Sequence, residues 1–176
     1  MIAFCLGGLG WTLAEYLIHR FDGHGNKGRT ASSREHLAHH ANPMYFAATW
    51  KKLAAASAVG VTLWGLTGGL FAAGFVVMYL TYERVHRRIH THGPIGPYGR
   101  WVRHHHLLHH HSNPRLNHGV TSPIWDVVFR TYQRKDIVNV PFRRAPVWLR
   151  DPETGLVAEA FSGRYSIRGN PRASPR

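Results

Sequence analysis

Ten of the fifteen histidines in this 176-residue chain fall into four short clusters with the spacing of metal ligands. The clusters are His19-x4-His24, His36-x2-His39-His40, His86-x3-His90 and His106-x2-His109-His110. Neutral imidazole binds mid-row divalent metals well, and one zinc site uses only three or four such ligands. The clusters therefore predict two metal ions, and any fold of this chain must bring four separate segments to one place.

Three of the four clusters fit one face of an α-helix. Residues at positions i, i+3 and i+4 lie on the same side of a helix, so the second and fourth clusters can each point three rings into one cavity. The third cluster spans one helical turn. His19 and His24 differ, because a step of five residues rotates about 140° around an α-helix. We therefore expect a helix break between them, at Asp22-Gly23.

The other five histidines lie beside the clusters but outside the repeated spacing, and we expect surface or supporting roles for them. They are His92, His104, His105, His111 and His118. A solvated histidine tract would form one contiguous run at a terminus, whereas these clusters are separated by apolar spans and Gly/Pro breaks. A built metal site is therefore the favoured interpretation.

The longest uncharged stretch runs from Leu53 to Tyr82. As one helix it would be about 45 Å long, more than the roughly 30 Å hydrocarbon core of a bilayer requires. A single crossing would also place the second and third histidine clusters on opposite sides of the membrane. We therefore expect an apolar hairpin that turns near Gly68-Gly69, although arms of about 15 residues are short for a full crossing. The hairpin returns the flanking Lys and Arg residues to one side, as the positive-inside rule requires.

A second apolar segment, Ile2 to Ile18, precedes the first cluster. A signal peptide is the competing interpretation, but the segment lacks a basic start and the first ligand pair follows it directly. We therefore expect a retained membrane helix. Glu15 lies one turn before His19 and is predicted to orient that histidine through its second ring nitrogen, with a simple interfacial carboxylate as the alternative.

The formal net charge of +13 would suggest nucleic-acid binding in a soluble protein. Here the Lys and Arg residues concentrate beside the apolar segments and in the tail from 133 to 176, which holds nine basic and four acidic residues. That pattern predicts a cytoplasmic face against anionic lipid, and no nucleic-acid partner. Cys5 is the single cysteine, which excludes a disulfide within the chain and a thiolate metal site.

The predicted fold is all-α: an integral membrane helical bundle with a cytosolic, histidine-lined dimetal cap. Residues 1–132 form the membrane domain, with an apolar helix at 1–18, the apolar hairpin at about 50–85, and histidine-rich cytosolic helices at 19–48 and 86–132. Residues 133–176 form a basic cytoplasmic tail, short and irregular or a hairpin around Asp151 to Gly155, with a disordered Gly/Pro/Ser/Arg end after Ala160. The tail either covers the metal cavity or packs on its surface.

The clusters lie within longer motifs. These are Glu15-Tyr16-x2-His19-Arg20-Phe21, Asn42-Pro43 after the second cluster, Tyr82-Glu83-x2-His86-x3-His90, His106-Leu107-x-His109-His110, and Gly119-Val120-Thr121-Ser122-Pro123-x-Trp125-Asp126-x2-Phe129. Together they cover about Trp11 to Tyr132, and the combination is far more specific than any one cluster. In these motifs the chain resembles the fatty acid 2-hydroxylases of the fatty acid hydroxylase and sterol desaturase superfamily.

The resemblance implies a membrane oxygenase that hydroxylates a fatty-acyl chain of a lipid with O2 and two external electrons. Its cofactor would be two iron ions held by the ten clustered histidines, with zinc possible in a purified sample. The electrons would come from a separate donor, cytochrome-b5-like or ferredoxin-type. Tyr82, Glu83 and Asp126 match polar positions near the site in the family; helix-end and turn contacts are the alternative for these three.

Two other functions stay open: a sterol or carotenoid hydroxylase or desaturase of the same superfamily, and a non-enzymatic membrane metal-binding protein. The chain departs from the family at Arg130, where glycine is common, and at His118, where an aromatic residue is usual; a tolerated substitute is the expectation for His118. Trp64, Phe71 and Phe75 are predicted lipid or cavity contacts, with simple helix packing as the default.

Overall fold

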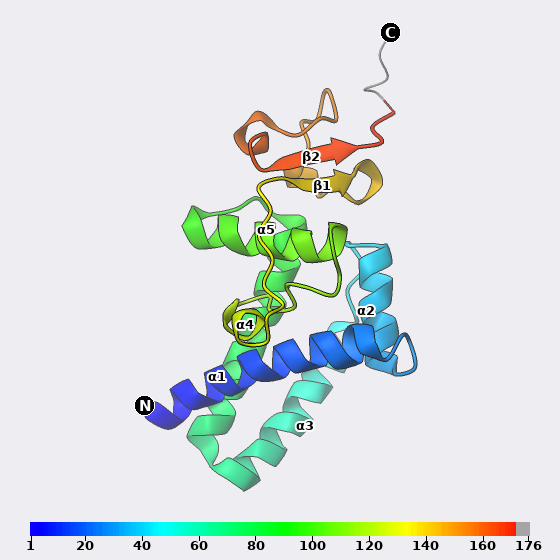
Figure 1. Cartoon of the computed structure of the whole chain (residues 1–176). Coiled ribbons are helices and arrows are strands. Elements are labelled where there is room, and N and C mark those ends of the chain that lie inside the picture. The colour runs from blue at the N-terminus through cyan, green and yellow to red at the C-terminus, as the bar shows by residue number, and fades with distance from the viewer. Residues whose placement is uncertain (172–176) are drawn as a thin grey trace.

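The computed structural model describes residues 1–171 and is mainly helical (Figure 1). Helix α1 (Ile2–Leu17) runs directly into a π-helix, η1 (Ile18–Gly25). The helices α2 (Ala31–Ala41), α3 (Thr49–Thr67), α4 (Gly69–Thr91), α5 (Gly96–His111) and the short α6 (Ile124–Val128) follow. The predicted helical architecture is confirmed for the part of the chain that carries the histidine clusters.

Helices α3 and α4 form the predicted hairpin, with the turn at Gly68. Gly68 has a φ of +86°, a conformation that a residue without Cβ adopts at low cost. Near the open end of the hairpin, an ion pair joins Lys52 of α3 to Glu83 of α4. Because α4 has 23 residues and α3 has 19, the last turns of α4, beyond the Lys52–Glu83 ion pair, carry His86 and His90 toward α5.

Helix α1 crosses α4 at direct backbone contact. A Cβ atom on Gly7 would lie 2.1 Å from the carbonyl oxygen of Phe71, and one on Gly74 would lie 2.0 Å from that of Phe4. Only glycine permits this approach, which lets α1 lie across the hairpin as Figure 1 shows. The crossing fixes the direction in which α1 delivers the first histidine pair.

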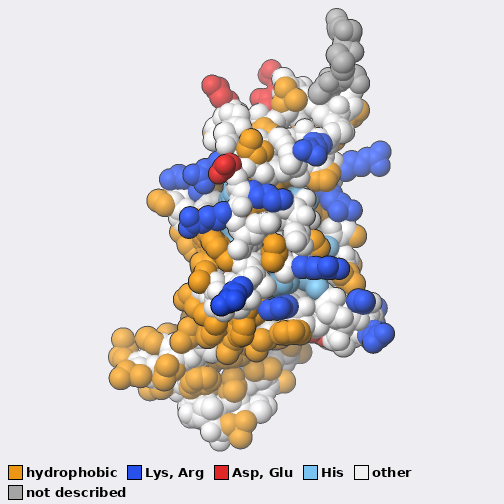
Figure 2. Space-filling view, in the orientation of Figure 1, with side chains coloured by type: hydrophobic (Ala, Val, Ile, Leu, Met, Phe, Trp, Pro, Cys, Tyr) orange, Lys and Arg blue, Asp and Glu red, His pale blue; other side chains and the backbone are white. Residues whose placement is uncertain are grey.

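Apolar side chains gather over α1 and the hairpin end of the molecule, and Lys and Arg side chains lie beyond them (Figure 2). Within the described residues, one helical segment, Ile2–Gly25, is long and apolar enough to cross a membrane. The arms of the hairpin do not meet that criterion. This agrees with the short uncharged length of each arm.

The tail forms a small parallel sheet of β1 (Val138–Pro141) and β2 (Tyr165–Arg168), with Val138 paired to Tyr165. The expected turn at Asp151 to Gly155 is present and is closed by an antiparallel bridge between Arg150 and Val157. Disorder after Ala160 was wrongly expected, because β2 is ordered there by the burial of Tyr165; residues 172–176 lie outside the described part. The all-α prediction therefore fails only in the tail.

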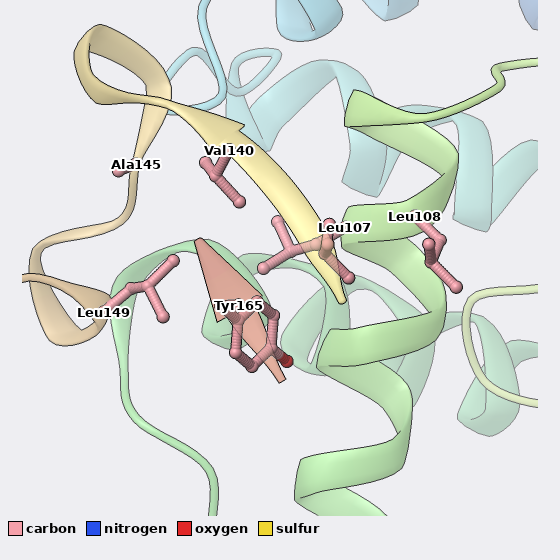
Figure 3. Packing of buried hydrophobic residues seen from close by; sticks show 7 residues of the cluster. Leu107, Leu108, Val140, Ala145, Leu149 and Tyr165 are labelled. Carbon is pink, nitrogen blue, oxygen red and sulfur yellow. The ribbon is translucent and has the colours of Figure 1, made fainter. Parts of the chain in front are cut away.

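The tail packs on α5 through a buried apolar cluster (Figure 3). Leu107 and Leu108 of α5 contribute to this cluster together with Val140, Leu149 and Tyr165 of the tail. The indole of Trp148 also donates a hydrogen bond to the carbonyl oxygen of Ile89 in α4, at 2.9 Å. Of the two possibilities left open for the tail, the structure shows packing against α5 and α4.

Candidate metal centre

The ten clustered histidines converge into two groups of five. Site A is defined by His19, His24, His36, His40 and His109; site B is defined by His39, His86, His90, His106 and His110. Within each site the candidate ligand nitrogens all lie within 4.8 Å of one another. The structure thus assembles all ten predicted ligands and none of the five other histidines; metal binding itself stays a prediction.

Both x-x-His-His motifs are divided between the two sites. Helix α2 gives His36 and His40 to site A and the intervening His39 to site B, and α5 similarly gives His109 to site A. Consecutive residues on an α-helix point about 100° apart, so adjacent histidines naturally serve two different ions. The sites are therefore neighbours, and the rings of His40 and His110 stack across the boundary at 4.0 Å.

The predicted helix break at Asp22-Gly23 is wrong, because the chain continues there as the π-helix η1. In a π-helix the hydrogen bonds run from i to i+5, so residues five apart lie on the same side. The rings of His19 and His24 accordingly lie 5.4 Å apart and nearly parallel. Glycine at position 23 instead leaves space for the ring of His36, because a Cβ atom there would lie 2.9 Å from Cδ2 of His36.

The nitrogen separations fit a metal with ligands at right angles. In site A the Nε2 atom of His24 lies 2.9 Å from that of His36 and 3.0 Å from that of His109. With metal–nitrogen bonds of about 2.1 Å, ligands at 90° are about 3.0 Å apart, whereas tetrahedral ligands are about 3.4 Å apart. The Nε2 atoms of His90 and His106 in site B are also 3.0 Å apart.

Three histidines are oriented for binding through Nε2 by backbone carbonyl groups. The Nδ1 atoms of His19, His39 and His109 lie 2.5, 2.9 and 2.7 Å from the carbonyl oxygens of His118, Tyr45 and Leu116, respectively. A carbonyl only accepts, so Nδ1 carries the proton and Nε2 keeps its lone pair. The Nε2 atoms of His19 and His39 are buried and have no hydrogen-bond partner within residues 1–171, so a metal ion fits the need of both.

Burial keeps these imidazoles neutral. It lowers the pKa of His36 to about 3 and that of His39 to about 4, from an ordinary value of 6.5. The pKa of His109 is also well below the usual range, chiefly because of burial and then because of the neighbouring His40. Neutral imidazole is the form that binds metal, so at neutral pH these ligands need not release a proton first.

Asp126 holds the loop that supports His19. Its buried carboxylate accepts hydrogen bonds from the backbone N–H groups of His118 and Gly119, both at 2.8 Å, and from the Thr131 hydroxyl at 2.7 Å. The Nε2 atom of His105 lies 3.3 Å from the same carboxylate. These contacts fix the carbonyl group of His118, which accepts the hydrogen bond from Nδ1 of His19.

Glu15 does not orient His19 directly, so that expectation is wrong. Its carboxylate instead accepts hydrogen bonds from the backbone N–H groups of Val120 and Thr121 and from the Thr121 hydroxyl. The partners of the carboxylate thus belong to a loop distant in the sequence and not to the ligand on its own helix. Glu15 therefore supports His19 indirectly: it binds the loop whose residue His118 accepts the hydrogen bond from His19.

Tyr82 and Glu83 have different surroundings. The ring of Tyr82 stacks on that of His86 at 5.6 Å and 20°. Glu83 is ion-paired with Lys52 across the hairpin and belongs to neither histidine site. The structure therefore places Tyr82 beside a candidate ligand and gives Glu83 a role in joining the hairpin arms.

Two histidines outside the clusters are buried, which the spacing did not indicate. His118 is 1% exposed, and its ring lies 5.4 Å from those of His19 and His109. The ring of His105 lies between those of Trp101 and Tyr132, at 5.1 and 5.4 Å. Surface or supporting roles were expected for these histidines. Both are buried beside the site and have supporting contacts, so neither is a surface residue.

Arg130 adopts a left-handed conformation with a φ of +56°. Glycine is favoured at such a position because it has no Cβ to clash with the backbone. The departure from the family pattern at this position therefore leaves the loop geometry in place, at the expense of backbone strain.

A cavity of about 660 Å³ opens from the histidines into the apolar part of the molecule. His19, His36, His39 and His86 lie on its wall together with apolar residues of α1, α3 and α4. Phe75 lines it, as predicted. Trp64 does not and is 67% exposed, whereas Phe71 packs against α1 at the glycine crossing. The candidate metal centre thus faces a chamber suited to an alkyl chain.

The chain is similar to known proteins over most of its length. The family model described as fatty acid hydroxylase matches residues 4–131. The ceramide very long chain fatty acid hydroxylase SCS7 of Saccharomyces cerevisiae is 32% identical over an alignment of 154 residues that covers 76% of this chain and 38% of that protein. The human fatty acid 2-hydroxylase is 29% identical over an alignment of 143 residues that covers 73% of this chain and 38% of that protein.

A plant relative and a solved structure extend the comparison. The dihydroceramide fatty acyl 2-hydroxylase FAH1 of Arabidopsis thaliana is 29% identical over an alignment of 133 residues that covers 69% of this chain and 56% of that protein. The structure titled full length scs7p, with only the hydroxylase domain visible, superimposes with a TM-score of 0.63 at 30% identity, covering 76% of this chain and 56% of that one. The chain thus spans between 38% and 56% of these curated relatives.

Proposed function

Because this chain belongs to the fatty acid hydroxylase family, we propose that it is a membrane-bound lipid hydroxylase with a dinuclear iron centre at sites A and B. The observation that carries the proposal is the convergence of ten histidines, in two adjacent groups, at the end of an apolar cavity. An ordinary metal-storage site would have no need of such a chamber. A fatty-acyl chain is the ligand that its shape and chemistry suit best.

Iron at these positions would supply the redox chemistry that breaks an unactivated C–H bond with O2 and two electrons. The protein's own contribution is positioning. Sites A and B hold the ligand imidazoles neutral and oriented, while the cavity holds the acyl chain against them and excludes water. The names of the relatives support attack at the carbon next to the acyl carbonyl. The electrons would come from a separate cytochrome-b5-like or ferredoxin-type donor.

The right-angle nitrogen separations support five- or six-coordinate iron over tetrahedral zinc. Each ion would be held by the five histidines of its site. Imidazole-rich sites also accept zinc readily, so we expect zinc in part of a sample purified without added iron.

The arrangement in the membrane follows from the distribution of side chains. We place α1 across the bilayer and the α3–α4 hairpin within its apolar region, with sites A and B and the basic tail at the cytoplasmic surface. The separation of apolar and basic side chains in Figure 2 supports this orientation.

The test is reconstitution of the full chain in lipid nanodiscs with iron, O2, a reducing system and candidate lipids. We expect about two iron ions per chain and a hydroxylated fatty acid or ceramide by mass spectrometry. His39→Ala and His109→Ala should each remove metal and activity, whereas the exposed His92→Ala should not. Hydroxylation of a sterol or carotenoid only would favour the related branch, and reversible metal exchange without any turnover would refute an enzyme.

A further inference from the structure

The wall of the apolar cavity carries two hydrogen-bond donors that have no acceptor in the described chain. Trp11 is 8% exposed, and its Nε1 atom is buried without a partner. Tyr82 also lines the cavity, and its hydroxyl forms no hydrogen bond with any residue from 1 to 171. Buried polar groups are normally satisfied, so the buried Nε1 atom of Trp11, with the unpartnered hydroxyl of the half-buried Tyr82 on the same cavity wall, points to a ligand that supplies the acceptor.

These two donors lie beside the candidate metal centre. The rings of Trp11 and Tyr82 are 5.5 Å apart, and Tyr82 in turn stacks on His86 of site B. Edge-on packing against Phe75, at 5.4 Å, and against Tyr79, at 4.7 Å, fixes the indole of Trp11 in place. A group bound between the two donors would be one ring away from a candidate ligand.

Other indole groups in this protein do have acceptors. Trp125 donates to the Thr12 hydroxyl at 3.0 Å, and Trp148 donates to the carbonyl oxygen of Ile89 at 2.9 Å. In both cases the acceptor is a group of the protein itself. Trp11 differs from these two in that it lines the cavity.

We propose that Trp11 Nε1 and the Tyr82 hydroxyl together donate to the carbonyl oxygen of the acyl substrate. The proposal rests on the proposed function for the identity of the ligand as an acyl lipid. It assigns a position to the substrate, because a carbonyl held there places the adjacent carbon at the histidine end of the cavity. The rest of the alkyl chain then lies against the apolar wall that includes Phe75 and Val76.

The charges around the cavity indicate which carbonyl fits best. The two lysines on its wall are already paired, Lys51 with Glu35 and Lys52 with Glu83. Trp11 and Tyr82 are neutral donors, and burying a carboxylate without a free cation is costly. We therefore expect an uncharged amide carbonyl, as in an N-acylated lipid, to bind more tightly than a free fatty acid carboxylate.

Binding to the zinc-loaded full chain in nanodiscs, which cannot turn over, tests the subsite directly. The probes are N-methylpalmitamide, palmitate and hexadecane, the last of which has no carbonyl group. Trp11→Phe and Tyr82→Phe should each weaken binding of the amide by about 2- to 10-fold and leave hexadecane unchanged. Trp64→Phe and Tyr98→Phe are matched controls, because Trp64 is exposed outside the cavity and the Tyr98 hydroxyl already donates to Thr121.

Equal losses for hexadecane and the amide would overturn the proposal, since they would indicate lost packing and not a lost hydrogen bond. So would unchanged amide affinity in both variants. Tighter binding of palmitate than of the amide, with the same dependence on Trp11, would keep the subsite and reassign its ligand to the free acid.

The iron-loaded protein provides a second measurement. If the subsite positions the substrate, Trp11→Phe with Tyr82→Phe should spread hydroxylation over neighbouring carbons, while the wild type attacks a single one. A single product carbon in the double variant would refute the subsite and leave the proposed function intact. Conversely, Trp11-dependent amide binding by a wild-type protein that never hydroxylates would refute the proposed function alone.

Discussion

Gly23 makes room for a candidate ligand, and we expect Gly23→Ala to empty site A. The Cβ atom of alanine would lie 2.9 Å from Cδ2 and 3.3 Å from Nε2 of His36. Ordinary contact begins near 3.4 Å, so the ring of His36 must move by about 0.5 Å. Metal–nitrogen distances tolerate deviations of only about 0.2 Å, so the displaced ring should bind poorly.

The expected loss of metal in Gly23→Ala can be distinguished from an effect of helix propensity, because helix propensity would favour the variant. Alanine is favoured over glycine in a helix by about 1 kcal/mol, so Gly23→Ala would otherwise stabilise the segment. We expect the metal content, measured by inductively coupled plasma mass spectrometry, to fall from about two ions per chain toward one. The control is Gly25→Ala in the same π-helix, whose Cβ would meet the Arg20 carbonyl oxygen at an ordinary 3.5 Å. Two ions per chain in Gly23→Ala, or equal losses in both variants, would refute the steric argument.

Three further outcomes follow from the loops and the ligands. Glu15→Ala should lower the free energy of unfolding by about 3 kcal/mol or more, measured by chemical denaturation, because it strands three buried donors of residues 120–121; a loss below 1 kcal/mol would contradict this. The metal-free protein should lose stability as the pH falls from 6.5 toward 4, because the folded pKa of His39 is about 4 and the unfolded chain then binds more protons. A midpoint of urea unfolding that does not change between pH 7 and pH 5 would contradict this prediction of pH-dependent stability. Arg130→Gly should raise the free energy of unfolding by about 1 kcal/mol, because glycine adopts the left-handed conformation at this position without strain. A lower melting temperature in the variant than in the wild type would contradict this prediction.

The spacing of residues along the sequence predicted those features that depend on the geometry of a single helix or turn. The ligands of α2 and α5 were identifiable because residues three and four apart share a helical face. The turn at Gly68 followed from the requirement that His39 and His86 lie on the same side, and the structure brings both into site B. In each case the evidence lay within one helix or at one turn.

Features that depend on distant partners were not predictable in this way. The π-helix of η1 shows no signature in its residues, and it brings His19 and His24 to one side where an α-helix would separate them. Glu15 precedes His19 by one turn, yet its hydrogen-bond partners are more than a hundred residues away. The parallel pairing of β1 with β2 likewise joins segments separated by an irregular stretch, so no hairpin signal could reveal it.

The packing of the tail on α5 has a consequence for biosynthesis. The chain emerges from the ribosome from its N-terminus, so His19 is made long before the residues that complete its surroundings. The loop that holds His118 and the strands that cover Leu107 are made later. We therefore expect newly made α1 and the hairpin to reach the membrane first, with metal acquired only after the loop of His118 and the strands β1 and β2 have been made. A ribosome-bound chain stalled before residue 138 should accordingly retain little iron.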